Sequence, residues 1–91
     1  MTRTAAVELD RALSHVREHD PAAADRISRA IDMTLDWIAR WPAASREVPG
    51  HDLRSTLVPR YQYRIFYRIA GDDIVVRNIR STRQLRPWEK A

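Results

Sequence analysis

Arginine is the residue type in this sequence that is best suited to bind a ligand, and it is concentrated in the second half of the chain. The 91 residues carry a formal net charge of +4. Residues 1–45 hold six Arg against seven acidic residues, whereas residues 46–91 hold nine Arg and one Lys against five, so the halves carry −1 and +5. Guanidinium groups bind carboxylates and phosphates through two parallel hydrogen bonds. The basic half predicts an acidic partner: nucleic acid, an acidic protein segment or a membrane surface.

Two groups of arginines stand out because of their apolar neighbours. The first interleaves three arginines with two apolar residues, and its members are Arg64, Phe66, Arg68, Arg77 and Ile79. Exposed apolar groups surrounded by charge are typical of a protein contact. The second group is a basic tail with one aromatic anchor, formed by Arg80, Arg83, Arg86, Trp88 and Lys90. We expect this tail to bind a target. A solvated strand face and a solvated tail are the alternative interpretations.

Most other chemistry is poorly represented in the sequence. There is no cysteine, so disulfides and thiolate metal sites are excluded. We interpret His15, His19 and His51 as surface residues that share no metal-ligand spacing on one face. Ser45, Ser55 and Ser81 have no adjacent histidine or acid that would activate them, and the two glycines form no phosphate-binding loop. We therefore predict no cofactor and no metal.

The cellular compartment is predicted from what the sequence lacks. A secreted domain of this size usually carries disulfides. No apolar run approaches the roughly 20 residues that a bilayer span needs. The N-terminus also lacks the apolar stretch of a signal peptide. We expect a cytoplasmic protein without membrane contact.

Residues 4–40 are predicted to form an antiparallel helical hairpin that positions the basic half. The first helix repeats apolar residues at helical spacing, namely Ala5, Leu9, Ala12, Leu13 and Val16. Asp20 and Pro21 supply an N-cap and a first turn for the second helix, whose core stripe is Ile27, Ile31, Leu35 and Ile38. Met33 and Trp37 lie on a neighbouring stripe, which belongs either to the core or to a binding groove.

Residues 53–80 are predicted to form an antiparallel β-meander after a loop over residues 41–52, and residues 81–91 form the basic tail. A turn over residues 70–73 sets Ile69 opposite Ile74 and Tyr67 opposite Val76. The face toward the helices then collects Tyr63, Ile65, Tyr67, Ile69, Ile74 and Val76. The outer face collects Arg64, Phe66, Arg68, Val75, Arg77 and Ile79. A slip of one residue would move the second strand's side chains to the other face. The prediction is one α+β domain.

This order of elements resembles the ParE/RelE family of toxins from type II toxin–antitoxin systems, over roughly Ala5 to Trp88. Four stretches carry the resemblance: His19–Arg26, Trp41–Pro42 followed by Arg46 and Pro49–Gly50, Tyr63–Arg68, and Arg77–Arg83. The third is similar to the family's central strand, Tyr-Arg-Ile-x-Tyr-Arg. Family members usually begin with a short strand before the first helix, for which this chain has almost no residues.

The resemblance implies a growth-inhibiting toxin of the kind that stabilises plasmids. Its antitoxin would be a small DNA-binding protein whose flexible segment wraps the toxin in a hetero-oligomer. We expect that segment at the first arginine group, Arg64, Phe66, Arg68, Arg77 and Ile79, and also at Met33 and Trp37. We expect Arg80, Arg83, Arg86 and Trp88 to bind the target.

The family has two branches with different targets. RelE-type members cut mRNA on the ribosome, and Arg64 and Arg83 match that branch's arginines. Its lysines are missing here, and Pro87–Trp88 stand where it has a tyrosine. We therefore favour the non-enzymatic ParE branch, which inhibits DNA gyrase. A ribosome-dependent mRNA endonuclease and a direct nucleic-acid-binding module are the alternatives.

Overall fold

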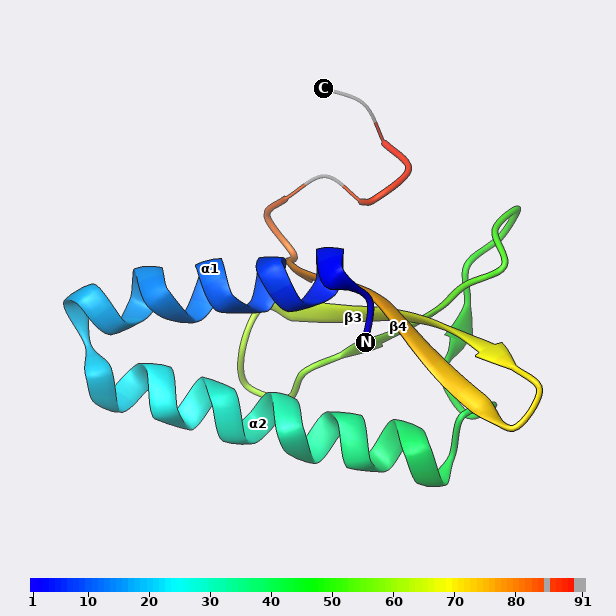
Figure 1. Cartoon of the computed structure of the whole chain (residues 1–91), viewed down its shortest axis with the longest axis horizontal. Helices are drawn as coiled ribbons and strands as arrows, with labels where there is room; N and C mark the ends of the chain where they lie inside the picture. The colour runs from blue at the N-terminus through cyan, green and yellow to red at the C-terminus, as the bar shows by residue number, and fades with distance from the viewer. Residues whose placement is uncertain (85, 90–91) are drawn as a thin grey trace.

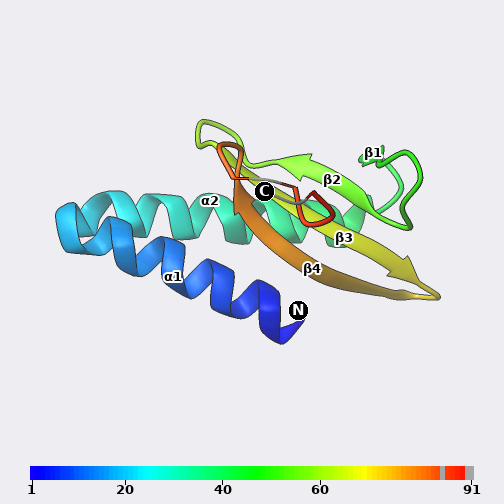
Figure 2. The same ribbon diagram turned by 90° about the horizontal axis from the view of Figure 1, so that it is seen from above.

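The computed structural model describes residues 1–84 and 86–89, and it shows a helical hairpin packed with an antiparallel sheet (Figure 1). The elements are α1 (Arg3–His19), α2 (Pro21–Arg40), β1 (Arg46–Glu47), β2 (Arg54–Leu57), β3 (Tyr63–Ala70) and β4 (Asp73–Ser81). The four strands form one sheet in the order β1-β2-β3-β4. Seen from above, the described residues that follow β4 lie over the sheet, on the side away from α2 (Figure 2). The predicted α+β class is confirmed.

The two helices begin where capping side chains satisfy their first backbone N–H groups. Thr2 caps α1 by accepting a hydrogen bond from the Ala5 amide at 3.1 Å. Asp20 caps α2 by accepting one from the Ala23 amide at 3.0 Å, with Pro21 in the first turn, as the sequence predicted. The Thr2 amide also donates to the Val76 carbonyl at 2.8 Å, so the start of α1 is tied to β4.

The core forms between the hairpin and the inner face of the sheet. Its buried residues come from both helices, both long strands and the segment between β2 and β3: Ala5, Ile27, Ile31, Ile38, Val58, Ile65, Tyr67, Val76 and Ile79. The Tyr67 hydroxyl donates a 2.6 Å hydrogen bond to the Pro42 carbonyl, which satisfies the one polar group of this buried ring. The core and this hydrogen bond therefore hold the sheet against the C-terminal end of α2.

The register of β3 and β4 follows the prediction near the turn and departs from it further on. Ile69 pairs with Ile74 and Tyr67 with Val76, as expected. A β-bulge follows, because Phe66 pairs with Asn78 and leaves Arg77 as an extra residue. One extra residue shifts the alternation of every later side chain to the other face. The prediction that Ile79 lies on the outer face is therefore wrong, since this side chain is only 2% exposed within the core.

The segment predicted as a loop over residues 41–52 contains the short strand β1 and is held in place by Arg54. The Arg54 Nη1 atom donates to the Ser45 carbonyl at 2.8 Å, and Nη2 donates to Glu47 Oε1 at 3.0 Å. The hydroxyls of Ser45 and Thr56 also form a hydrogen bond. These contacts place residues 46–49 beside the outer face of the sheet, where they help to form a pocket.

Within the described part of the chain, neither helix is apolar enough over a sufficient length to cross a membrane.

Candidate protein-interaction surfaces

Phe66 lies on the outer face of the sheet, but the chain's own tail covers it. The Trp88 ring meets it edge-on, with ring centroids 5.7 Å apart, and stacks on the His51 ring at 4.4 Å. Phe66 is consequently only 2% exposed. The expectation of an exposed Phe66 is therefore wrong in this structure, because Trp88 contacts it from within the same chain. We call Phe66, Trp88 and His51 the aromatic clamp.

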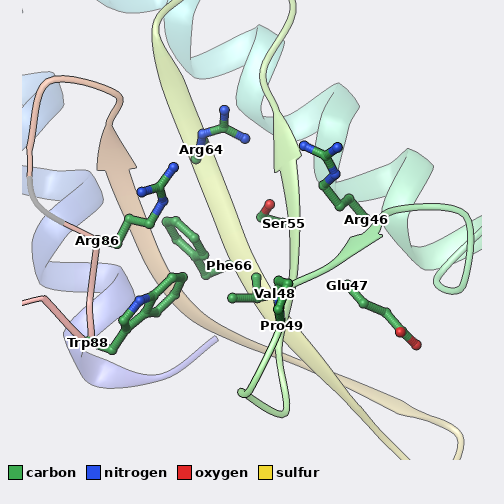
Figure 3. Close-up of a pocket in the computed structure, with 9 residues that line it drawn as sticks. All are labelled: Arg46, Glu47, Val48, Pro49, Ser55, Arg64, Phe66, Arg86 and Trp88. Carbon is green, nitrogen blue, oxygen red and sulfur yellow. The ribbon is translucent and has the colours of Figure 1, made fainter.

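Two adjoining pockets flank Phe66, and we call them together the arginine cleft. The first has a volume of about 390 Å³ and is lined by Arg46, Glu47, Val48, Pro49, Ser55, Arg64, Phe66, Arg86 and Trp88 (Figure 3). The second has about 220 Å³ and is lined by Arg64, Phe66, Arg80, Ser81, Thr82, Arg83, Gln84, Arg86 and Glu89. The sheet, the residues around β1 and the tail thus all contribute to a cleft rich in guanidinium groups.

The arginines of this cleft differ in how far they are already engaged. Arg80 Nε donates to Glu8 Oε2 at 2.6 Å, so this predicted target-binding residue is bound to α1. Arg86 pairs with Glu89 at 3.2 Å. Among the described residues, Arg46, Arg64 and Arg83 form no ion pair with an acidic side chain. These three guanidinium groups are the ones that an acidic ligand would meet unpaired. Lys90, part of the predicted tail, lies outside the described residues.

A second concave surface, the α2 groove, lies between α2 and the segment around β2. It has a volume of about 820 Å³ and is lined by Arg26, Arg29, Ala30, Met33, Thr34, Trp37, Thr56, Leu57, Pro59, Arg60 and Tyr61. Met33 is 72% exposed, Leu57 50% and Trp37 41%. Met33 and Trp37 therefore line a groove and do not belong to the core; that this groove binds a partner stays a prediction. The groove has an apolar floor and three arginines among its lining residues.

The residues expected to bind the antitoxin are thus divided among separate places. Arg64 and Phe66 line the arginine cleft, whereas Met33 and Trp37 line the α2 groove. Arg68 is half-buried opposite Val75, and Arg77 is exposed at the bulge. Neither of these two arginines lines the cleft or the groove. The single binding face predicted from strand alternation does not exist as one surface.

The structure also corrects the interpretation of the histidines. His15 and His19 lie one helical turn apart on α1, with ring centroids at 5.4 Å, and Glu18 lies beside them. The statement that the histidines share no ligand spacing holds for His51 but is wrong for this pair. The signal for this pair in the sequence is the i, i+4 spacing of His15 and His19 within one helix.

Fold and surfaces together define a small α+β protein with one basic cleft and one apolar groove. The chain matches the family model described as "ParE toxin of type II toxin-antitoxin system, parDE" over residues 1–86. It therefore belongs to the ParE toxin family. A solved structure titled "Chromosomal ParDE TA system from P. aeruginosa" is similar to it, with a TM-score of 0.78 and 22% identity. That likeness covers 88% of this chain and 89% of the other, and it concerns the fold. No curated protein sequence gives a significant match.

Proposed function

We propose that this ParE-family toxin is neutralised by a cognate antitoxin that occupies the α2 groove, and that its target is DNA gyrase, engaged through the arginine cleft. The observation that carries the proposal is the family match over residues 1–86, which covers the α2 groove and all of the arginine cleft except Trp88 and Glu89. The two surfaces differ in chemistry, and that difference supports separate partners for them.

The α2 groove suits an amphipathic segment with acidic residues along one side. Met33, Trp37 and Leu57 offer exposed apolar area that an apolar helix face would remove from water. Arg29 and Arg60 line the same groove and form no ion pair within the described chain. A flexible antitoxin segment that folds on binding can meet both requirements. The apolar residues supply affinity, while the arginines favour acidic partners and set the orientation.

The arginine cleft suits an anionic target. Arg46, Arg64 and Arg83 approach it from three parts of the chain, and a carboxylate or phosphate placed there would meet several guanidinium groups at once. The aromatic clamp holds the tail against the sheet and so keeps Arg86 at the edge of the cleft. We therefore assign Arg64 and Phe66 to the target-binding side, together with Arg83, Arg86 and Trp88.

The RelE-type alternative has one observation in its favour, because Arg64 and Arg83 line the same pocket. Among the described residues that line this pocket there is no histidine, lysine or tyrosine, and the one carboxylate, Glu89, is paired with Arg86. The pocket offers electrostatic stabilisation of an anion but no evident pair of groups for proton transfer. This arrangement favours binding over RNA cleavage.

A nucleic-acid-binding module is favoured less, because Phe66, the aromatic residue expected to stack on bases, is covered by Trp88.

The proposal is tested by expressing the chain alone and together with a candidate cognate antitoxin. We expect growth arrest in the first case and rescue in the second. Purified protein is then assayed separately for inhibition of gyrase supercoiling and for ribosome-dependent mRNA cutting. Growth arrest without rescue would contradict the antitoxin part of the proposal. If the purified protein cuts mRNA on ribosomes but does not inhibit supercoiling by gyrase, the assignment of gyrase as the target is wrong.

A further inference from the structure

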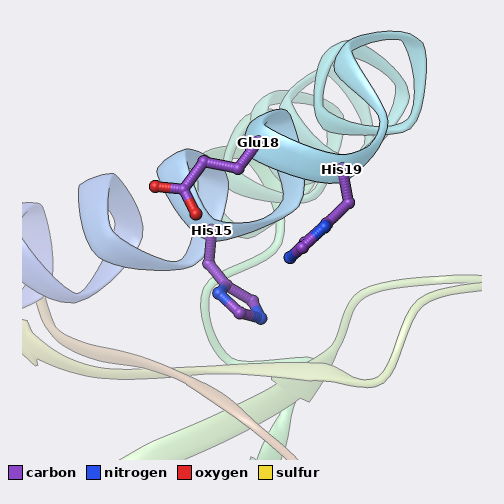
Figure 4. A group of neighbouring side chains, drawn as sticks. All are labelled: His15, Glu18 and His19. Atoms are coloured by element: carbon purple, nitrogen blue, oxygen red, sulfur yellow. The ribbon is translucent and has the colours of Figure 1, made fainter.

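We propose that His15, Glu18 and His19 form a binding site for a divalent transition-metal ion at the C-terminal end of α1. The proposal does not depend on the toxin function, since these residues line neither the arginine cleft nor the α2 groove. One potential ligand atom from each residue lies within 4.8 Å of those of the other two. Both imidazoles extend from the same side of the helix (Figure 4).

The spacing of these residues follows from helix geometry. Residues three and four positions apart are neighbours on an α-helix surface, so His15 can meet both Glu18 and His19. Two histidines at i and i+4 on one helix face form a recurring zinc-binding arrangement. α1 continues through His19, so the backbone that fixes this spacing is regular helix throughout the cluster.

The three side chains are available for a ligand. All are exposed, and among the described residues no hydrogen bond or ion pair engages them. Atoms bound to one zinc ion lie about 3 to 3.5 Å apart, given bond lengths of about 2.0 to 2.2 Å. The side chains must therefore approach one another by about 1 to 2 Å on binding. Exposed side chains can do this by changing rotamer, without disturbing the core.

The local electrostatics also favour a cation. The last turn of a helix carries the negative end of the helix dipole and unpaired carbonyl groups. Glu18 adds a carboxylate to this end of α1. A bound cation would therefore be stabilised by the end of α1 as well as by direct coordination, and opposed in part by Arg17 and by the N-terminus of α2, which begins at Pro21. It would also join positions 15 and 19 and oppose fraying of the last turn.

The donor set selects among metals. Two imidazole nitrogens and one carboxylate oxygen suit Zn²⁺, Ni²⁺ or Cu²⁺, whereas Mg²⁺ and Ca²⁺ prefer sites made of oxygen alone. Three protein ligands leave at least one coordination position for water or for a side chain of another molecule. The expected site is therefore open and solvent-accessible.

The test is a titration of the full-length, tag-free protein with ZnCl₂ and separately with NiCl₂, followed by calorimetry and by the imidazole C–H resonances. We expect one metal ion per chain, with the His15 and His19 resonances shifted and the His51 resonance unchanged. His15→Ala and His19→Ala should each weaken Zn²⁺ binding by about tenfold or more, and Glu18→Gln by a smaller factor. MgCl₂ should give no binding.

His51→Ala is the matched control, because His51 is exposed but lies outside the cluster, against Trp88. It should leave the Zn²⁺ affinity unchanged. ZnCl₂ should raise the midpoint of thermal unfolding of the original chain but not that of the His15→Ala/His19→Ala double variant. Circular dichroism shows whether that variant keeps its helices. If the folded double variant binds Zn²⁺ as tightly as the original chain, or if His51→Ala loses as much affinity, the proposed site is wrong.

Discussion

The Glu8 carboxylate of α1 and the Arg80 guanidinium of β4 form a 2.6 Å charged hydrogen bond that joins the helical hairpin to the strand beside the arginine cleft. The same carboxylate accepts hydrogen bonds from Asn78 Nδ2 at 2.9 Å and from the Ile79 amide at 3.2 Å. Both charged side chains are largely shielded, with exposed fractions of 18% for Glu8 and 26% for Arg80. One side chain of the first helix therefore fixes three consecutive residues of the last strand.

Removal of the Glu8 carboxylate should destabilise the fold. In Glu8→Ala the Asn78 amide, the Ile79 N–H and the Arg80 guanidinium lose their shared acceptor. We expect the free energy of unfolding in urea to fall by about 2 to 3 kcal/mol. Asp10→Ala, on an exposed position of the same helix, is the control and should change it by about 0.5 kcal/mol or less. Equal losses in the two variants would show that Glu8 is not a structural anchor.

The β-bulge at Arg77 can be tested through the residue that it moves into the core. Ile79→Ala should lower the free energy of unfolding by about 2 to 4 kcal/mol, because it leaves a cavity beside Ile65. Val75 lies on β4 before the bulge, is half-buried, and serves as the control. Val75→Ala should cost clearly less. If Ile79→Ala costs no more than Val75→Ala, Ile79 faces outward and the register without a bulge is correct.

Binding of the antitoxin should depend on the α2 groove. Trp37→Ala should weaken the complex by about 2 kcal/mol or more, roughly 30-fold, since a large aromatic anchor is lost. Thermal stability should change little, because Trp37 lies outside the buried core. Calorimetric titration with purified antitoxin measures the affinity. Arg68→Ala, at a residue that does not line the groove, is the control and should bind normally. An unchanged affinity for Trp37→Ala would place the antitoxin on another surface.

The target surface should be separable from the antitoxin surface. Arg64→Ala and Arg83→Ala should each reduce the inhibition of the target by about tenfold, because each removes an unpaired guanidinium from the cleft. Arg64→Lys should recover only part of this loss, since an ammonium group cannot form the bidentate contact. Antitoxin affinity, measured in parallel, should stay within about twofold of the original. A parallel loss of both activities would mean that the two partners share one site.

The sequence predicted the elements that depend on local signals. Asp20 and Pro21 mark the break between the helices, and Gly71 with two aspartates marks the turn of the β3–β4 hairpin. Alternation along residues 61–69 also identified Ile65 and Tyr67 as inner residues, and both are buried, whereas Ile69, predicted on the same face, is 36% exposed. These signals act over a few residues, so they can be detected without knowledge of the rest of the fold.

Contacts between residues far apart in the sequence could not be predicted in this way. Glu8 and Arg80 are 72 positions apart, so nothing near Arg80 indicates that its guanidinium is engaged. The bulge at Arg77 has no glycine or proline to mark it, yet it moves Ile79 to the core. The contact of Trp88 with Phe66 likewise depends on the path of the tail. The candidate surfaces therefore differ from the prediction: eight of the eleven predicted site residues line the arginine cleft or the α2 groove, but most of the other lining residues, such as Arg46 and Arg60, were not predicted.

The most direct test of the central claim is a gyrase supercoiling assay with relaxed plasmid, purified toxin and increasing amounts of cognate antitoxin. We predict that the toxin alone inhibits supercoiling, that equimolar antitoxin abolishes the inhibition, and that Arg64→Ala toxin inhibits poorly. The same preparation should leave ribosome-bound mRNA intact. Normal supercoiling in the presence of folded toxin, together with cleavage of mRNA on ribosomes, would contradict the account.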